Sequence, residues 1–403
     1  MSFPACKHRK RIARPAVRTL VWLGSEPYRL FFLSGILFSI AGVAMWPLFY
    51  SGHLAFYPGI NHARLMIEGF GGGFVIGFLG TAGPRMLSAP RLKPWELVVL
   101  FLLHLGNGFS HLRGLTTLGD GLFLTLLAAF ALSLGVRLFF FRREWPPPAM
   151  LLAGTGLLCG LTGTLMWLNP AWLLVPGLQR LAGLLLYQGF LLGPIMGVGI
   201  FLFPRLLGGN FGEPESAPDR RRALIDMAVA AVALVASFGV EIWVNPVAGY
   251  LLRAAAFIFA LSHVRWLLPK GSASPGTLAN ALRFWCLPLA VAGLIAPAVS
   301  YRYNIALEHL LFIGGFGMVC LIAASRVLFG HSGSLARFGK GSWIARIIVF
   351  ATVLAALTRA SADFMPRIMI SHYKYAAWSW GLGALIWALW HARRFFKKDP
   401  GDD

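Results

Sequence analysis

The chain alternates between apolar runs of about 20 residues and short polar connections. A run of this length spans the hydrocarbon core of a bilayer as one helix. Twelve runs fit this description, at 30–50, 65–83, 95–112, 115–138, 149–168, 181–203, 223–243, 247–267, 279–299, 305–329, 342–362 and 374–392. We therefore predict an all-α fold, a polytopic membrane bundle of about 12 transmembrane helices.

Lysine and arginine concentrate in alternate connections between these runs, for example at Arg85, Arg142 and Arg220, and in the C-terminal tail. The opposite connections are poorer in charge. Because cytoplasmic loops are enriched in Lys and Arg, this bias predicts that both termini are cytoplasmic. The expected organisation is a basic cytoplasmic tail at 1–28, a single transmembrane domain at 29–395 and a cytoplasmic tail at 396–403.

Composition supports the membrane interpretation. Of the residues, 57% are hydrophobic and 13% are charged, whereas soluble domains carry about 25% charged residues. The net charge of +21 invites a nucleic-acid-binding interpretation. However, the basic residues lie in short loops, and the chain has no nucleic-acid-binding motif. The expected partner is therefore the lipid bilayer and not a nucleic acid.

Three of the predicted helices carry an arginine near the end on the basic side, namely Arg85, Arg205 and Arg326. They lie 120 and 121 residues apart, and the first two follow a proline and share a Gly-Phe pair 16 residues upstream. A fixed period predicts structurally similar units, here at 29–145, 146–270 and 271–395. The alternative is that these matches are coincidental, because Gly, Phe and Leu are common in this chain.

A polar residue lies 17 positions before each of these arginines, namely Glu68, Gln188 and His309. On a helix this separation corresponds to roughly 25 Å, so the three side chains should share one depth toward the outer face. Polar groups in a membrane usually face a bundle interior or a cavity. We hypothesise that they line a common site and ligate metal or relay protons, with Glu68 and Gln188 as catalytic candidates. Separate pairing of each one with a neighbouring helix is the alternative.

The three arginines also allow two explanations. Arginines at a helix end snorkel to lipid headgroups. Alternatively, Arg85, Arg205 and Arg326 point inward and bind an anionic group such as a haem propionate.

Histidines are the strongest candidate metal ligands, because neutral imidazole suits copper, iron and zinc and is a usual axial ligand of haem. His62 and His309 lie near the same outer end and are candidates for one shared metal site. His104 and His111 share roughly one face of their helix. His331 lies on the other side of the membrane. A lone membrane histidine also serves as a hydrogen-bonding partner between helices.

Two stretches resemble the NnrS family of bacterial membrane proteins. The family motif His-x-His-Glu-Met, followed two residues later by Gly-Phe, is similar to the stretch from His62 to Phe70. The family motif Arg-x-x-Leu-Gly-His-Thr-Gly is similar to the stretch from Arg326 to Gly333. The resemblance covers most of the chain. The threefold arrangement also resembles the catalytic subunits of haem–copper oxidases, at the level of the fold alone.

The resemblance implies a bacterial inner-membrane protein that binds haem, with copper more weakly indicated, and that acts in nitric oxide metabolism. His62 and His331 match family histidines, which implies a metal role for both. Arg64 and Leu65 stand where the family motif has His and Glu. Glu68, one turn further on, is a candidate substitute for the lost carboxylate.

Two other classes of function remain open at this stage. One is a transporter or permease-like bundle whose polar layer binds a small substrate or ion. The other is a non-catalytic membrane subunit that docks another protein. The sequence also leaves open whether the chain is an enzyme, the type of haem, the electron donor and the oligomeric state.

Overall fold

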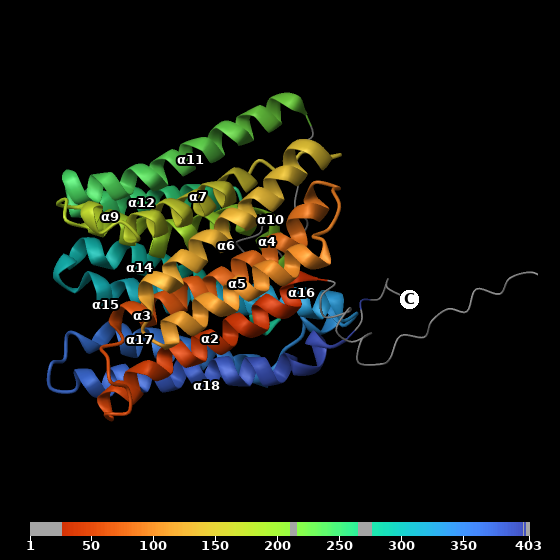
Figure 1. Cartoon of the computed structure of the whole chain (residues 1–403). Coiled ribbons are helices and arrows are strands. Elements are labelled where there is room, and N and C mark those ends of the chain that lie inside the picture. Colours follow the sequence, from red (N-terminus) through yellow and green to blue (C-terminus); the bar gives the residue numbers. More distant parts are fainter. Residues whose placement is uncertain (1–25, 210–215, 265–275, 398, 400–403) are drawn as a thin grey trace, which may run out of the picture.

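The computed structural model describes residues 26–209, 216–264, 276–397 and 399. Within these residues the chain is almost entirely helical and contains no strand. The long helices run side by side along one direction (Figure 1). This architecture follows from the apolar sequence, because a helix satisfies its backbone hydrogen bonds internally in a lipid environment.

The first third of the bundle contains helices from α2 to η2. Their bounds are α2 (Pro27–Tyr50), α3 (Gly59–Arg64), the π-helical segment η1 (Leu65–Gly71), α4 (Gly72–Met86), α5 (Pro94–Leu112), α6 (Thr116–Val136) and the π-helical segment η2 (Arg137–Phe141).

The middle third extends from α7 to α12. Its bounds are α7 (Met150–Trp167), α8 (Pro170–Leu173), α9 (Leu178–Gly183), the π-helical segment η3 (Leu184–Gly189), α10 (Phe190–Leu206), α11 (Ala217–Trp243) and α12 (Pro246–Ser262).

The last third extends from α13 to α18. Its bounds are α13 (Thr277–Ala281), η4 (Leu282–Cys286), α14 (Leu287–Val299), η5 (Tyr301–Tyr303), α15 (Asn304–His309), the π-helical segment η6 (Leu310–Gly317), α16 (Met318–His331), η7 (Leu335–Arg337), α17 (Trp343–Ala362) and α18 (Met369–Phe395).

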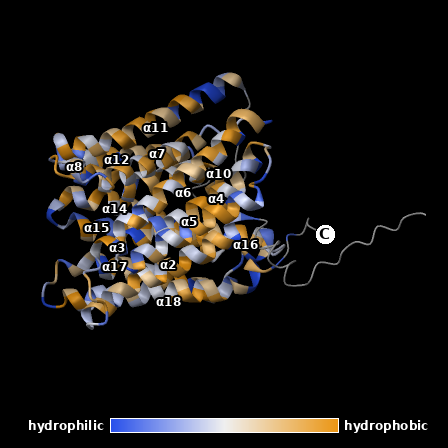
Figure 2. Cartoon of the chain, in the orientation of Figure 1, coloured by the Kyte–Doolittle hydropathy of each residue, from blue (hydrophilic) through white to orange (hydrophobic). Residues whose placement is uncertain are grey.

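The membrane character of the bundle is confirmed. Nine of the described helices are long and apolar enough to cross a bilayer, and α12 is a shorter apolar helix. Figure 2 shows hydrophobic residues along the flanks of the bundle and hydrophilic residues gathered toward its two ends. Leu132, Phe140 and Val232 are each more than two-thirds exposed, as expected for side chains that face lipid. The number of crossings stays a prediction, and most of the 1–28 tail lies outside the described residues.

Contacts between helices join the predicted units in a closed ring. Helix α6 contacts α7, α12 contacts α14, and α18 contacts α2. Inside this ring, α16 contacts both α10 and α4. The division into three four-helix units stays a prediction.

The second helix of each predicted unit contains a π-helical segment, η1, η3 or η6. Such segments are rare and are frequent at functional sites. Glu68 lies within η1, Gln188 lies within η3, and His309 directly precedes η6. Segments of the same kind occur at η2 and η4, so a π segment alone does not mark a site.

Close packing of α7 against α10 depends on glycine. A Cβ atom added at Gly156 would lie 2.3 Å from Cδ of Pro194 and 3.1 Å from the carbonyl oxygen of Phe190. Small residues let membrane helices approach each other in this way. Gly154, one half-turn away on the same helix, has nothing within 4 Å of such a Cβ.

We expect Gly156→Ala to lower the unfolding temperature of the detergent-solubilised protein, because a forced clash in a packed interface costs about 1–3 kcal/mol. Gly154→Ala is the matched control. It should leave that temperature unchanged or raise it slightly, since alanine favours helix by about 1 kcal/mol over glycine. Equal unfolding temperatures for the two variants would show that this interface tolerates a side chain.

Candidate functional site

A cavity of about 890 Å³ lies where α4, α10 and α16 approach one end of the bundle. Each of these three helices contributes one arginine to the lining, namely Arg85, Arg205 and Arg326. Arg143 and Arg220 add two more guanidinium groups. We call this space the arginine cavity. The structure thus brings the three sequence-predicted arginines together around one space.

The arginine cavity carries more positive than negative charge. Its five arginines face two carboxylates, Glu144 and Asp399. Arg205 and Arg326 lie close enough to repel each other. Within the described parts of the chain, Arg326 forms no hydrogen bond or ion pair. A cavity with this charge balance suits an anionic ligand.

Arg85 is held at the edge of the cavity by a buried carboxylate. Its Nη2 donates to Oε1 of Glu26 over 2.5 Å, and Arg91 lies 3.0 Å from the same oxygen. Burial raises the pKa of the Glu26 carboxyl above its ordinary value, and the guanidinium groups of Arg85 and Arg91 offset part of that rise. Arg85 therefore has a fixed position beside His331.

His331 is the last residue of α16 and lines the same cavity. Its Nδ1 lies 2.6 Å from Oδ2 of Asp399, and its Nε2 lies 3.1 Å from Nη1 of Arg85. The ring of Tyr28 lies against the imidazole, with 4.7 Å between centroids. A carboxylate partner at one ring nitrogen orients the other nitrogen toward a metal in many metalloproteins.

These residues fit haem as the group that the resemblance implies. Haem is a large flat molecule with two carboxylates and an iron that accepts imidazole. The cavity offers guanidinium groups for the carboxylates and His331 for the iron. Its wall also includes the aromatic side chains of Trp145 and Phe201.

A second, smaller pocket of about 70 Å³ adjoins the arginine cavity and shares Phe78 and Leu202 with it. Its lining is apolar and comes largely from the same three helices, for example Val75, Val198 and Ala323. Space of this kind admits a small uncharged molecule and disfavours an ion.

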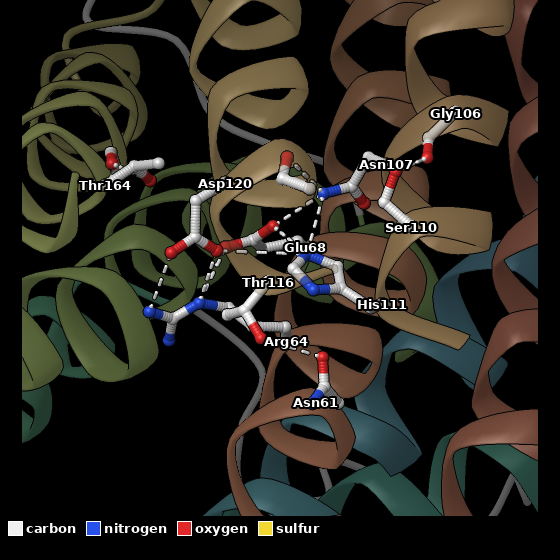
Figure 3. A network of polar contacts seen from close by, with 12 residues as sticks. Asn61, Arg64, Glu68, Gly106, Asn107, Ser110, His111, Thr116, Asp120 and Thr164 are labelled. Atoms are coloured by element: carbon white, nitrogen blue, oxygen red, sulfur yellow. Dashed lines mark hydrogen bonds and ion pairs between the residues drawn. The ribbon is translucent and has the colours of Figure 1, made fainter. Parts of the chain in front are cut away.

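The predicted polar layer consists of two buried networks near the other end of the bundle. In the first, Nε of Arg64 lies 2.7 Å from Oδ1 of Asp120 and 3.2 Å from Oε1 of Glu68 (Figure 3). Oε2 of Glu68 accepts from Nδ2 of Asn107 over 2.6 Å and lies 3.0 Å from Nε2 of His111. Arg64, Glu68 and His111 are fully buried.

Tyr187 connects this first network to the next third of the bundle. Arg64 donates to the hydroxyl of Tyr187, and its guanidinium stacks over Trp167 at 4.6 Å. Tyr187 precedes Gln188 on η3. Both networks therefore include a residue of η3, and these two residues, Tyr187 and Gln188, are adjacent in the chain.

The second network surrounds Gln188. Arg253, also fully buried, donates to Oε1 of Gln188 over 2.7 Å and to Oε2 of Glu241 over 2.5 Å. Arg180 lies 2.8 Å from Glu241 and 2.8 Å from Glu308. Two guanidinium groups thus face two carboxylates.

His309 belongs to neither network, so the structure does not bring Glu68, Gln188 and His309 to one point. Its Nδ1 lies 2.6 Å from the carbonyl oxygen of Ile305. The preceding residue, Glu308, takes part in the second network instead, and the hydroxyl of Tyr250 donates to it.

His62 lies apart from the haem candidate His331. Its Nδ1 lies 3.0 Å from the carbonyl oxygen of Gly42, and His309 is its electrostatic neighbour.

The described residues offer a different group of possible metal ligands. Glu68, His111 and Asp120 place one ligand atom each within 4.8 Å of one another, and no other set of three or more His, Cys, Asp or Glu does so in those parts of the chain.

Sequence reasoning missed Asp120, Glu241, Arg253 and Glu308. A signal was present, because all four are charged residues inside predicted spanning runs, where charge is expensive and usually paired. Glu308 also follows Gln188 by the repeat period of 120 residues.

The fold and the cavity define a helical membrane protein with an arginine-lined cavity between its central helices. The chain belongs to the NnrS family, whose model, described as NnrS protein, matches residues 23–398. No curated protein matches the chain.

We expect Arg253→Gln to destabilise the detergent-solubilised protein by about 3–5 kcal/mol, because it leaves Glu241 buried with one guanidinium partner fewer. Arg113→Gln is the matched control, since Arg113 is exposed at the end of α5, and it should change stability by less than about 0.5 kcal/mol. Thermal unfolding followed by circular dichroism measures both. Equal unfolding temperatures would show that the second network contributes little to stability.

Proposed function

We propose that this NnrS membrane protein binds haem in the arginine cavity and acts in nitric oxide handling. The observation that carries the proposal is the meeting of Arg85, Arg205, Arg326 and His331 around one space of about 890 Å³. Arginine side chains that only reached lipid headgroups would not be expected to line one cavity from three different helices.

Each residue of the cavity has a defined part in this proposal. Arg205 and Arg326 would hold the two propionates, which relieves the repulsion between their guanidinium groups. Arg85, fixed by Glu26, would keep positive charge beside the ligand. Asp399 would hold the proton on Nδ1 of His331 and orient the ring. Nε2 of His331 would ligate the iron in place of its 3.1 Å contact with Nη1 of Arg85. Haem supplies, when bound, an iron centre that binds nitric oxide and exchanges electrons.

The small apolar pocket supports a gaseous substrate over an ion. Nitric oxide is small and uncharged, so the lining of Val75, Val198 and Ala323 does not exclude it. An anion that entered the arginine cavity would meet this apolar lining at the centre of the bundle and pay a large desolvation cost. The geometry therefore favours a haem protein over a permease for anions.

The purified protein should show a Soret absorption band and contain iron. Arg326→Gln removes one charge without breaking an ion pair in the described chain. Loss of a charge-assisted bond costs about 1.5–3 kcal/mol, so haem affinity should fall about ten- to hundredfold. Haem titration measures the affinity, and Arg113→Gln should leave it unchanged. Protein from haem-supplied cells with no Soret band and no iron would contradict the proposal.

His331→Ala should shift the Soret band and lower haem retention, because it removes the iron ligand and leaves the arginines in place. His62→Ala is the matched control at the other end of the bundle and should leave the spectrum unchanged. Nitric oxide added to the reduced wild-type protein should also shift the band. A spectrum insensitive to both His331→Ala and nitric oxide would place the haem elsewhere and remove the basis for the nitric oxide role.

A further inference from the structure

Glu68, His111 and Asp120 form a compact ligand set at the end of the bundle opposite the arginine cavity. All three are buried, and their ligand atoms lie within 4.8 Å of one another. Two carboxylates and an imidazole are a donor set that suits divalent transition metals. Nδ1 of His111 and Oδ1 of Asn107 are buried polar atoms without a hydrogen-bond partner among the described residues.

A cation already lies against this set. Arg64 contacts both oxygens of Asp120, with Nε 2.7 Å from Oδ1 and Nη2 3.2 Å from Oδ2, and Nε lies 3.2 Å from Oε1 of Glu68. Figure 3 shows the guanidinium on the same carboxylates that a metal would use. An arginine side chain cannot lose its proton, so this positive charge is permanent.

Adding a divalent metal beside Arg64 would be unfavourable. Three positive charges would then face the two carboxylates of Glu68 and Asp120 in a buried site, where unmatched charge is costly. The second network uses the same solution, because Arg253 and Arg180 balance Glu241 and Glu308 without a histidine. In the second network the guanidinium groups balance the buried acids, and in the first network Arg64 offsets one of the two carboxylate charges.

The donors therefore do not fit copper while Arg64 is present. We infer that Arg64 is the resident cation of the Glu68–His111–Asp120 cluster, that it excludes a divalent metal from this cluster, and that Arg64→His opens a divalent transition-metal site there. The first network holds one guanidinium against two carboxylates, so removing Arg64 leaves a doubly negative, partly hydrogen-bonded pocket. The new imidazole would add a second nitrogen donor.

Cobalt(II) is the probe, because its visible spectrum reports coordination. Wild type, Arg64→His and the control Arg113→His are purified as full chains in detergent, treated with a chelator, and equilibrated with cobalt chloride. Unbound metal is removed by gel filtration. Cobalt content is measured by elemental analysis, and cobalt-minus-buffer difference spectra cancel the contribution of any haem.

Wild type and Arg113→His should retain no cobalt above background. Arg64→His should retain about one cobalt per chain with a ligand-field band, and Arg64→His combined with His111→Ala should lose it. Arg64→His that elutes like wild type but retains no more cobalt than Arg113→His would overturn the inference.

If Arg64→His is not recovered as a folded protein, the cobalt content of the wild type alone tests whether Arg64 excludes metal. Wild type with about one cobalt per chain, lost in His111→Ala, would show that the guanidinium does not exclude metal and would overturn the inference. Wild type without cobalt supports it. This readout is independent of haem in the arginine cavity, so the inference and the proposed function succeed or fail separately.

Discussion

Permanent positive charge buried in an apolar bundle is the constraint that orders the half of this protein opposite the arginine cavity. Arg64 and Arg253 have no solvent exposure, and a guanidinium cannot discharge itself by losing a proton. Each must therefore reach carboxylates or amides on other helices. Arg64 connects α3 to α6 and η3, and Arg253 connects α12 to α11 and η3. Helix packing through small residues tolerates alternative registers, so we expect these contacts to select one register between neighbouring helices.

Charge balance distinguishes the two ends of the bundle. The network around Gln188 contains two guanidinium groups and two carboxylates. The network around Glu68 contains one guanidinium group and two carboxylates. The arginine cavity has five arginines and two carboxylates on its wall. The excess of positive charge in the arginine cavity favours an anionic ligand, whereas the charges of the network around Gln188 balance each other. This charge balance is the reason why the proposed site for an anionic cofactor is at the arginine end, although the sequence analysis placed the catalytic candidates at the opposite end.

Apolar runs of about 20 residues predicted the helices because lipid leaves a backbone few alternatives. The repeat period also predicted that Arg85, Arg205 and Arg326 are equivalent. It failed at His309, which was reached by counting 17 residues back from Arg326. Arg326 follows Arg205 by 121 residues and not by 120, so the count is displaced by one residue. Glu308 keeps the 120-residue spacing from Gln188 and joins its network. One residue turns a helix by about 100°, which is enough to move a side chain to another face. Long-range partners such as Asp120, 56 residues from Arg64, leave no local pattern.

The two family motifs have different outcomes in this chain. The second motif, from Arg326 to Gly333, contributes an arginine and a histidine to the arginine cavity, and both side chains line that cavity. The first retains His62 but has Arg64 and Leu65 in place of a histidine and a glutamate. From the sequence alone, such a substitution indicates only that two motif residues are absent. In the structure Arg64 binds the carboxylates of Glu68 and Asp120, so a permanent positive charge stands where the family motif has a histidine. Because the two motifs lie at opposite ends of the bundle, a substitution in the first motif leaves the lining of the arginine cavity unchanged.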